Sequence, residues 1–527
     1  MITLSPGETE LFDFLISTTK DLNVTLRIAG GWVRDKILGN ISDDIDISIE
    51  TISGNLVTGE QIAHMISQTN NATVSVIKTN PEKSKHIETA QITVMGYHLE
   101  FCHLRKDDYT NDSRIPTILP ATPQEDARRR DFTCNALSYN LSTQQIEDYV
   151  NGLDDIKNKV LRCPLNPIET FDDDPLRILR CIRFAAKLDF QLDASIREIL
   201  IVKLERHNEP FFTHGSKDII LDSLTWNILK KVSRERYGIE IKKMLSGPDP
   251  VRCVSLLDRS GLLYSTILIE MYPSKTHYVC SLKSSERQIT FEKIVTVIQP
   301  KDWKSCFDVT EDILYSALLN KTHLNSDDKL IVSLFSLLAI PLVRMVNINI
   351  SNVLAERTQA IIQHGLKFPK KVYSDVLTML NALAIIDSDV MNEIKNTVIN
   401  AYNDKLNSTK IDGNVRLKLF HALRCMRSLS DDVIISWLNV VETLIFNDVP
   451  PLTDLFTKSV IVDTALFNCG KIIPMIRGDA IISNVLPDLP SQQINEVLTA
   501  ELYYQLNNPD ATIEEITHHL QKVFKKN

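Results

Sequence analysis

Residues 27–49 read RIAGGWVRDKILGNISDDIDISI, and this stretch decides the fold of the first part of the chain. A short apolar strand runs into the glycine pair Gly30 and Gly31, and a helix is expected to leave it. Two glycines let a phosphate group approach the backbone, and a helix N-terminus offers unpaired N–H groups. Arg34 follows one turn later, within reach of the same phosphates. A glycine pair alone is more often a simple turn, so the neighbouring residues must support this interpretation.

The second half of the stretch predicts a β-strand with two carboxylates on one face. Because side chains alternate along a strand, Asp44 and Asp46 share one side, and Ile45, Ile47 and Ile49 share the other. Carboxylates this close repel each other unless a cation lies between them, and hard oxygen ligands suit Mg²⁺. A lone pair of this kind is usually a solvated edge. Its position about a dozen residues after the glycine pair favours a metal site.

Other short β-like runs surround this strand, and one of them carries Glu100. Leu99 and Phe101 are expected to pack inward, which turns Glu100 to the other face as a third candidate catalytic carboxylate. An exposed glutamate explains the pattern nearly as well. A helix with a capping box is expected after Ser5, burying Leu11, Leu15 and Leu22. Further strands are predicted at 24–29, 74–77 and 92–94, and a hairpin turn is predicted at 95–97.

A second cluster, EDARRRDFTCNA at 125–136, combines three arginines with an Asp and an Asn. Asp131 and Asn135 lie at i and i+4, so a helix would place them on one face with Arg128. Such a set can hydrogen-bond the hydroxyl groups of a ribose. Arg130 and its neighbours could equally form a solvated face.

A third cluster, DDDPLRILRCIR at 172–183, places acids where a helix is expected to begin. Arg177, Arg180 and Arg183 repeat every three residues and form one basic stripe. Most such patterns are capping acids followed by a solvated face. A sharper interpretation pairs Asp174 with Arg177 as an acceptor and a donor side by side.

Composition limits the class of protein. With 527 residues, the chain is too long for one ordinary core, so we expect about two to four domains. Its 16 glycines are few for this length and favour helices, which dominate the periodicity after Gly152, where no convincing run of strands remains. The net charge of −9 excludes a globally basic nucleic-acid coat but leaves a local basic face possible. Nine cysteines without zinc-ligand spacing indicate free thiols in a reducing compartment.

Two membrane-related signals are absent from the sequence pattern. The longest apolar run, 330–346, is interrupted by polar residues and a proline, so we interpret it as a buried helix. The first ten residues contain no Lys or Arg and no apolar core, so they do not have the pattern of a signal or transit peptide.

Taken in order, the motifs resemble the class II tRNA nucleotidyltransferases, the CCA-adding enzymes, in their eukaryotic form. The resemblance is highly specific, since the motifs keep the family order within about 180 residues, and it covers the first half of the chain. Beyond about residue 250, only length and helical character match. The matching stretches are GGWVRD…DID (30–46), LEFCHLR (99–105), EDARRRDFTCNA (125–136), DYVNGLDD (148–155) and DDPLRILR (173–180).

The resemblance implies an α+β fold: a polymerase-β-like nucleotidyltransferase head with a small mixed sheet, followed by an all-α neck, body and tail. The implied boundaries are 1–150 for the catalytic head, 151–250 for the neck that recognises the nucleotide base, 251–430 for the body and 431–527 for a tRNA-binding tail. Residues 234–243 resemble the neck element that supports the base-reading helix, although a charged amphipathic helix explains them too.

The resemblance also implies a role for each matched residue. Asp44 and Asp46 would bind two Mg²⁺ ions, with Glu100 as a third catalytic candidate. The other implied roles are triphosphate contact for Gly30, Gly31 and Arg34; nucleotide contact for Arg130; ribose reading for Asp131 and Asn135; a hinge for Asp148 and Gly152; base reading for Asp174 and Arg177; further nucleotide contacts for Arg180 and Arg183; and a flexible loop for Lys83 and Lys85. The usual Glu-Asp of the family is Asp173-Asp174 here, which keeps the acid on a shorter arm.

The implied activity is addition of C, C and A to tRNA 3′ ends from CTP and ATP, without a template and with pyrophosphate release. A poly(A) polymerase of the same family, or a non-catalytic helical RNA-binding scaffold, remains the alternative. Cations such as Lys410, Arg416 and Lys418 could contact tRNA phosphates. No membrane and no obligate protein partner are expected. The family works in cytoplasm, nucleus and mitochondrion, depending on the isoform.

Overall fold

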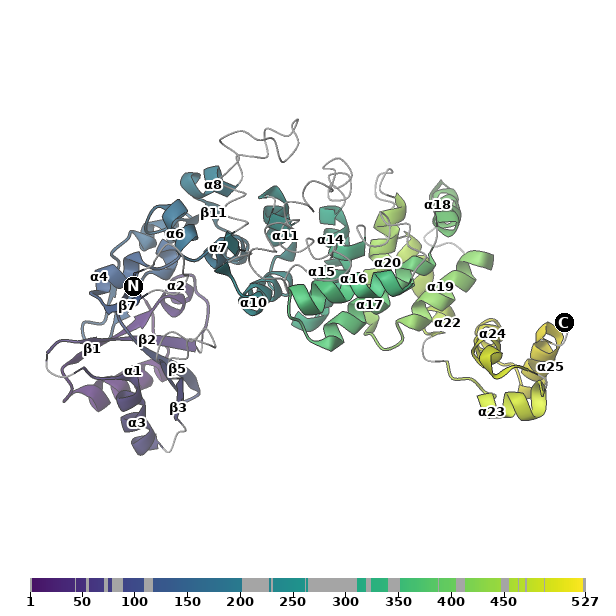
Figure 1. The fold of residues 1–527 in the computed structure, drawn as a ribbon, viewed down its shortest axis with the longest axis horizontal. Helices are drawn as coiled ribbons and strands as arrows, with labels where there is room; N and C mark the ends of the chain where they lie inside the picture. The colour runs from purple at the N-terminus through teal and green to yellow at the C-terminus, as the bar shows by residue number, and fades with distance from the viewer. Residues whose placement is uncertain are drawn as a thin grey trace. The chain divides into compact units, whose positions relative to one another are not determined.

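The computed structural model separates into two compact units, Met1–Glu240 with Arg259–Thr266, and Ile241–Asp258 with Ile267–Asn527 (Figure 1). This division into two units does not test the expected domain boundaries at 150, 250 and 430, which stay predictions. The described residues are 2–42, 44–53, 56–70, 74–77, 89–108, 117–200, 227–228, 231–260, 262–263, 310–318, 324–339, 351–386, 388–403, 413–446, 455–462, 464–469, 472–487 and 489–524.

The first unit is built around a mixed sheet with the strand order β3-β4-β5-β2-β1-β8-β9 (Figure 1). Strands β2 and β5 are parallel, and the other described neighbours are antiparallel. The pairing places β2 and β5, which carry the candidate carboxylates, side by side in the middle. The strands are β1 (Val24–Ala29), β2 (Asp44–Thr51), β3 (Val74–Ile77), β4 (Thr89–Val94), β5 (Tyr97–His103), β8 (Ser138–Asn140) and β9 (Gln145–Glu147).

Alternation of side chains explains why the central strands form. Ile45, Ile47 and Ile49 are fully buried on one face of β2, as the pattern predicts. The predicted hairpin turn is also confirmed, because Val94 pairs with Tyr97 and leaves a two-residue loop. Both loop residues, Met95 and Gly96, have positive φ, the conformation that suits a tight hairpin.

Helix α1 (Pro6–Thr19) begins at Ser5 with the predicted capping box. It buries Leu11 and Leu15, whereas Leu22 lies beyond the end of the helix and is half-buried. The helices α2 (Gly31–Ile37) and α3 (Gly59–Asn70) complete the packing of the sheet.

Arg27 joins three strands of the sheet. It lies on β1 with only 7% of its surface exposed. Its Nη1 donates to Glu50 at 2.6 Å, and its Nε donates to Glu147 at 2.6 Å. One buried guanidinium therefore ties β1 to β2 and to β9, and the two acids compensate the cost of burying its charge.

A layer of short helices follows the sheet in the first unit. This region corrects one expectation. Two short strand pairs lie outside the main sheet, neither of them predicted, and one of these pairs follows Gly152. The pairs are β6 (Arg105–Asp108) with β7 (Thr117–Pro120), and β10 (Val160–Leu161) with β11 (Gln191–Leu192). The helices are α4 (Pro123–Arg128), the 3-10 helix η2 (Thr133–Asn135), α5 (Gly152–Lys157), α6 (Pro167–Asp173), α7 (Leu176–Leu188), α8 (Ala194–Leu200) and α10 (Arg234–Leu245), whose last turn belongs to the second unit.

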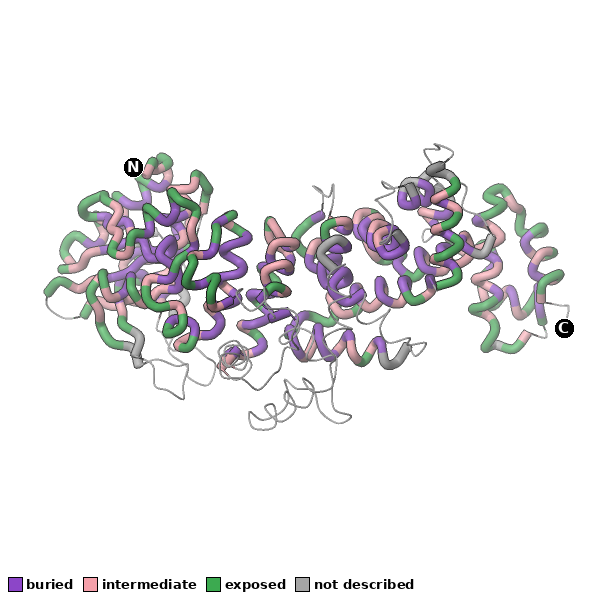
Figure 2. The backbone as a smooth tube through the Cα atoms, turned by 90° about the horizontal axis from the view of Figure 1, so that it is seen from above, coloured by how far each residue is buried: buried purple, intermediate pink, exposed green. Residues whose placement is uncertain are grey.

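The described residues of the second unit form helices and the turns between them, with no strand among them, and its buried residues gather where its helices meet (Figure 2). Helix α15 (Ser326–Ala339) is buried from Leu330 onward, which confirms a buried helix for the described part of the long apolar run. In the described part of the chain, we find no helix that combines the length and the apolarity needed to span a bilayer. The other helices are α11 (Pro250–Arg259), α14 (Thr310–Leu318), α16 (Ser351–Gln359), η8 (Ala360–Gly365), α17 (Lys370–Ile385), α18 (Ser388–Asn403), α19 (Gly413–Cys425), α20 (Asp431–Phe446), α21 (Leu455–Val462), α22 (Thr464–Phe467), α23 (Gly478–Ala480), η10 (Ile481–Val485), η11 (Ser491–Gln493), α24 (Ile494–Asn507) and α25 (Ile513–Phe524).

Candidate active site

The structure brings three carboxylates to one face of the sheet. Asp44 and Asp46 are exposed on β2, opposite the buried isoleucines. The parallel register with β5 places Glu100 directly beside Asp46. The sequence therefore predicted correctly that Glu100 lies on a neighbouring strand and faces the same way.

The carboxylates on this face repel one another. Part of the Asp46 side chain is exposed, but the surrounding protein limits the hydration of its carboxyl group and raises its pKa, and the negative charges of Glu100 and Asp44 raise that pKa further. Arg130 opposes the rise. Gln91 Nε2 donates to Glu100 Oε2 at 2.6 Å and holds that side chain on β5. A cation at this face would relieve the repulsion.

The donor set fits Mg²⁺. Among the described residues, no group of three or more His, Cys, Asp or Glu side chains forms a complete metal cage. Mg²⁺ is usually bound by one or two carboxylates together with substrate phosphates rather than by such a cage. Asp44 and Asp46 supply the two carboxylates that this kind of site needs.

The turn at Gly30 and Gly31 packs against the motif at 125–136. Gly30 ends β1 with a φ of +63°, which L side chains rarely adopt. A Cβ there would also lie 3.0 Å from Arg130 Nη1 and 3.2 Å from the Asn135 carbonyl oxygen. Gly31 then begins α2. Gly30 is thus required by both conformation and space, beside two residues that the sequence assigned to nucleotide binding.

Arg34 lies deeper than the sequence suggested. Only 3% of its surface is exposed. Its guanidinium donates to Asp35 at 2.7–2.8 Å and to Asn135 Oδ1, and it lies 5.1 Å from the centre of the Phe184 ring. Arg34 therefore fixes the side chain of Asn135 and stacks on α7 instead of extending into solvent.

Asp126 is a functional residue that sequence reasoning missed. Its Oδ1 accepts from Arg129 and its Oδ2 accepts from Arg130 Nη2 at 2.9 Å. Burial opposes the charge of Asp126, but Arg130 and Arg129 hold its pKa below the usual value. The i,i+3 and i,i+4 spacing within EDARRR was the available signal. Two of the three arginines are consequently oriented by one buried acid, whereas Arg128 is exposed.

Asp131 connects the motif at 125–136 with the motif at 172–183. Its Oδ1 accepts from Asn135 Nδ2 at 3.0 Å, and its Oδ2 accepts from Arg180 at 2.6–2.8 Å. Burial opposes ionisation, yet Arg180 and Asn135 hold the pKa of Asp131 below its usual value. The helix that would place Asp131, Asn135 and Arg128 on one face does not form, because α4 ends at Arg128 and η2 begins only at Thr133. The side-chain contact between Asp131 and Asn135 forms nevertheless.

Asp174 lies in extended backbone between α6 and α7 and is held by a residue of α10. Its Oδ1 accepts from the backbone N–H of Leu176 at 3.2 Å. Its Oδ2 accepts from Arg236 Nη2 at 2.6 Å. The carboxylate is thus aimed by Arg236, an ion-pair partner 62 residues away in sequence.

Arg177 is anchored by backbone carbonyls. Its Nη2 donates to the carbonyl of Arg129 at 2.8 Å, and its Nη1 donates to the carbonyl of Thr170 at 3.2 Å. The expected side-chain pair with Asp174 is replaced by these contacts, and the two residues meet through the Arg177 N–H and the Asp174 carbonyl at 2.9 Å.

The basic stripe of α7 is not a solvated face. Arg183 Nε donates to Glu240 of α10 at 2.5 Å, and Arg180 lies 3.8 Å from the same carboxylate. Arg34, Arg180 and Arg183 all lie over the Phe184 ring. Glu240 and Arg236 therefore bring α10 against the helix that carries the stripe.

The candidate hinge is a tightly capped turn. Asp148 accepts the N–H groups of Val150, Gly152 and Leu153 at 2.9–3.1 Å. A Cβ on Gly152 would lie 2.3 Å from the Thr133 carbonyl oxygen. The start of α5 is therefore pressed against η2, where only glycine fits. Lys83 and Lys85, the flexible-loop candidates, lie outside the described residues.

We expect Gly152→Ala to destabilise the protein by about 1–3 kcal/mol, since overpacking against backbone cannot relax cheaply. Urea unfolding of the full chain measures this. Gly31→Ala is the matched control, because its Cβ would meet only Arg34 Nη2 at an ordinary 3.8 Å. Equal unfolding midpoints for the two variants would contradict the close packing of α5 on η2.

Two family models match the chain in the region of these residues. The poly A polymerase head domain matches residues 26–162, which hold the acidic face, the glycine turn, the Asp131 cluster and the Asp148 turn. The probable RNA and SrmB-binding site of polymerase A matches residues 226–267, which include Arg236 and Glu240.

Curated relatives extend the likeness over nearly the whole chain. The mitochondrial CCA tRNA nucleotidyltransferase of Saccharomyces cerevisiae is 29% identical, over 95% of this chain and 89% of the relative. The tRNA nucleotidyltransferase cca2 of Schizosaccharomyces pombe is 28% identical, over 97% of this chain and 95% of the relative. The chain is thus similar over nearly its whole length to tRNA nucleotidyltransferases.

The fold agrees with that likeness. A solved CCA-adding enzyme in complex with CTP superposes with a TM-score of 0.60 at 16% identity, covering 99% of this chain and 97% of that one. The expected α+β fold, a polymerase-β-like head with a small mixed sheet followed by helical regions, is confirmed.

Proposed function

We propose that this nucleotidyltransferase adds C, C and A to the 3′ end of tRNA, using CTP and ATP and releasing pyrophosphate. The observation that carries the proposal is the extent of the sequence similarity to a relative named as a CCA tRNA nucleotidyltransferase. This similarity covers 95% of the chain and so includes the helical unit. The head alone would not separate this function from poly(A) addition, because its family model is shared with poly(A) polymerases.

The acidic face is the proposed site of nucleotidyl transfer. The 3′-oxygen of tRNA attacks the α-phosphorus, the bond to the β-phosphate breaks, and pyrophosphate leaves with the bonding electrons. Bound Mg²⁺ supplies charge neutralisation and favours the ionised 3′-hydroxyl. Asp44 and Asp46 would hold it, and Glu100, held by Gln91, adds negative charge that strengthens cation binding.

Asp174 and Arg177 are proposed to read the incoming base. A carboxylate accepts a hydrogen bond from the exocyclic amine of C or A, and a guanidinium donates to a ring nitrogen or carbonyl. U and G present no amine at that place and would leave the acceptor position that faces the base without a partner. Rejection follows from the cost of that unfilled acceptor position.

Arg236 supports this reading by holding the Asp174 carboxylate in place. A carboxylate offers about four lone-pair positions, so the 2.6 Å ion pair leaves room for an amine. The ribose is proposed to meet Asp131 and Asn135, whose positions are fixed by Arg180 and Arg34.

We expect Arg236→Gln to lower kcat/KM for both CTP and ATP by about tenfold, the effect of roughly 1.4 kcal/mol, and to increase UTP incorporation. The reason is that Asp174 loses the charge partner that orients it. Arg236→Lys should restore part of the loss. Glu235→Gln, an exposed neighbour on α10, is the control. Unchanged base selection in Arg236→Gln would contradict the positioning role.

Single-nucleotide incorporation tests the function itself. Purified protein with Mg²⁺ receives tRNA transcripts ending at the discriminator base, at C and at CC, with one nucleoside triphosphate at a time. Addition of C, C and then A, followed by a stop, is the expected result. Repeated A addition on any RNA would identify a poly(A) polymerase. Tight tRNA binding without any addition would leave a non-catalytic scaffold.

The remaining assignments are parts of the same proposal. The tail, residues 431–527, is proposed to bind tRNA, and the loop around Lys83 and Lys85 to assist the change from C to A addition. A relative with a mitochondrial name supports a mitochondrial role; cytoplasm and nucleus are proposed by resemblance.

A further inference from the structure

Three arginines of the candidate active site gather around one aromatic ring. The central guanidinium carbons of Arg34, Arg180 and Arg183 lie 5.1, 5.3 and 4.1 Å from the centre of the Phe184 ring. Arg34 comes from α2, and the other two come from α7, which carries Phe184 itself. The face of an aromatic ring is negative and attracts cations. Phe184 therefore provides a platform for cations from two helices.

The ring is shielded from water and held in place. Only 6% of Phe184 is exposed, and Arg34 and Arg183 are buried as well. The attraction between a cation and a ring is larger where water is excluded. Phe132 packs edge-on against Phe184, with 6.0 Å between the ring centres and 74° between the ring planes. This contact fixes the orientation of the platform.

Each of the three guanidinium groups also has a carboxylate partner, so the cluster is balanced in charge. The pairs are Arg34 with Asp35, Arg180 with Asp131, and Arg183 with Glu240. The acids offset the cost of burying the positive charges. What the ring adds is therefore the placement of the guanidinium groups, since their charge is already compensated.

Two of these arginines hold the proposed ribose-reading pair. Arg34 donates to Asn135 Oδ1, and Arg180 Nε donates to Asp131 Oδ2 at 2.8 Å. Asn135 Nδ2 donates to Asp131 Oδ1 at 3.0 Å. The contacts thus form a closed loop that begins and ends at the Phe184 ring. Hydrogen bonds set the distances within this loop, and the ring limits the tilt of both guanidinium groups.

We propose that Phe184 is a positioning residue for ribose selection. By carrying Arg34 and Arg180, its ring fixes where Asp131 and Asn135 meet the 2′-hydroxyl group of the incoming nucleotide. Phe184 acts through the two arginines. Only the assignment of Asp131 and Asn135 to the ribose is taken from the proposed function.

The first test replaces Phe184, in the full-length protein, with phenylalanines that carry one, two or three fluorine atoms on the ring. Fluorine weakens the negative ring face step by step and nearly keeps the size of the side chain. We expect the preference for ATP over dATP in kcat/KM to fall with each fluorine, by about tenfold at three, the scale of desolvated cation–π contacts. A side chain that only fills space would not respond in this graded way.

The kinetic constants identify the contact that is lost. The KM for ATP should rise while kcat stays nearly constant, because the contact with the 2′-hydroxyl group is made both before and during the reaction. The KM for dATP, which lacks this hydroxyl group, should not change. Phe184→Leu, which removes the ring altogether, should lower the preference at least as far as three fluorine atoms do.

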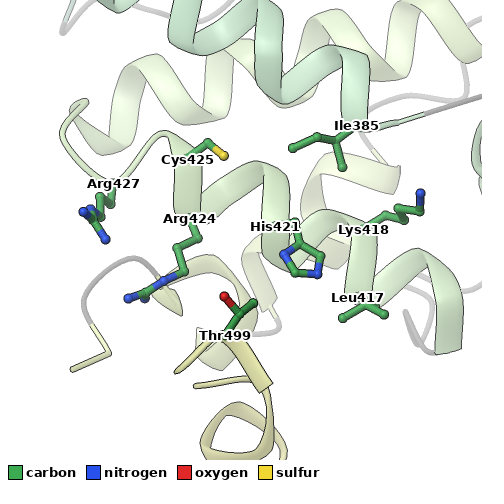
Figure 3. Close-up of a pocket in the computed structure, with 8 residues that line it drawn as sticks. All are labelled: Ile385, Leu417, Lys418, His421, Arg424, Cys425, Arg427 and Thr499. Atoms are coloured by element: carbon green, nitrogen blue, oxygen red, sulfur yellow. The ribbon is translucent and has the colours of Figure 1, made fainter. Parts of the chain in front are cut away.

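Two variants control for lost packing. Phe12 on α1 is as deeply buried as Phe184 and packs against the ring of Trp32. Phe12→Leu should keep the preference for ATP, because the ring contact that it removes carries no guanidinium group. Figure 3 shows Leu417 at a pocket of about 640 Å³ between α17, α19 and α24 in the second unit. Leu417→Ala removes apolar volume there and should also keep the preference.

Two results would overturn the role of Phe184: an equal preference for ATP along the fluorine series, or an equal loss of rate with ATP and dATP in Phe184→Leu. A wild-type protein that takes dATP as readily as ATP would overturn the ribose assignment, and with it the role of Phe184. Calorimetric titration with ATP and dATP measures the same preference without turnover. A wild-type protein that binds ATP selectively but adds no nucleotide would therefore overturn the proposed function alone.

Discussion

Asp46→Asn should abolish nucleotide addition, lowering kcat/KM for CTP and ATP by at least about a thousandfold, which corresponds to roughly 4 kcal/mol of transition-state stabilisation. Asp46 lies beside Asp44 and Glu100 on the central strands. An amide keeps the shape of the side chain but removes the negative charge that a hard cation requires. Affinity for tRNA should not change, because binding of the nucleic acid depends on cations elsewhere.

The same variant should be more stable than the wild type when Mg²⁺ is absent. Burial and the neighbouring negative charges raise the pKa of Asp46, and an uncharged amide removes both the cost of burying the charge and the repulsion. Asp13→Asn, an exposed acid on α1, is the control and should change neither activity nor melting temperature. Steady-state incorporation and thermal melting measure both effects. Retained turnover in Asp46→Asn would remove Asp46 from the metal site.

Asp174→Ala should relax base selection. We expect discrimination between CTP and UTP to fall by about a hundredfold, toward the level that shape alone provides. Arg177→Ala should act in the same direction, since each side chain reads one part of the base edge. The ion pair between Asp174 and Arg236 makes the effect larger than that of one hydrogen bond, because Arg236 is left without its partner.

The decisive measurement is competition between nucleoside triphosphates on tRNA ending at the discriminator base. Glu169→Ala, an exposed acid on the preceding helix α6, provides the matched control. A uniform loss of rate with unchanged selection would show that Asp174 supports the fold of the neck and does not read the base.

The local sequence pattern was sufficient to predict the central strands of the head. The strand at 74–77 was predicted to the residue, and the hairpin turn at Met95-Gly96 follows directly from its glycine. The alternation in 44–49 placed Asp44 and Asp46 on the right face because register is fixed by the buried isoleucines. The pairs β6–β7, β8–β9 and β10–β11 escaped prediction, since these short strands lack the run of β-branched residues that marks 74–77.

Long-range contacts were beyond the reach of the sequence. A continuous helix through Asp131 does not form, because Asp131 Oδ1 also accepts the N–H of Phe132. In addition, the Thr133 N–H donates to the carbonyl of Arg162 at 2.9 Å. These contacts override the i,i+4 spacing. Arg236 and Glu240 could be quoted as part of a motif, but nothing local showed that they bind Asp174 and Arg183.

Arg27 has a consequence for the way this protein is made. Its partner Glu50 leaves the ribosome soon after it, whereas Glu147 is added roughly a hundred residues later, about 5–20 s at ordinary rates of synthesis. Until β8 and β9 arrive, the growing chain holds β1 as an open edge with a half-paired guanidinium beside it. Completion of this sheet thus waits until residue 147 has been added, and chaperones that shield strand edges have their natural period of action in that interval.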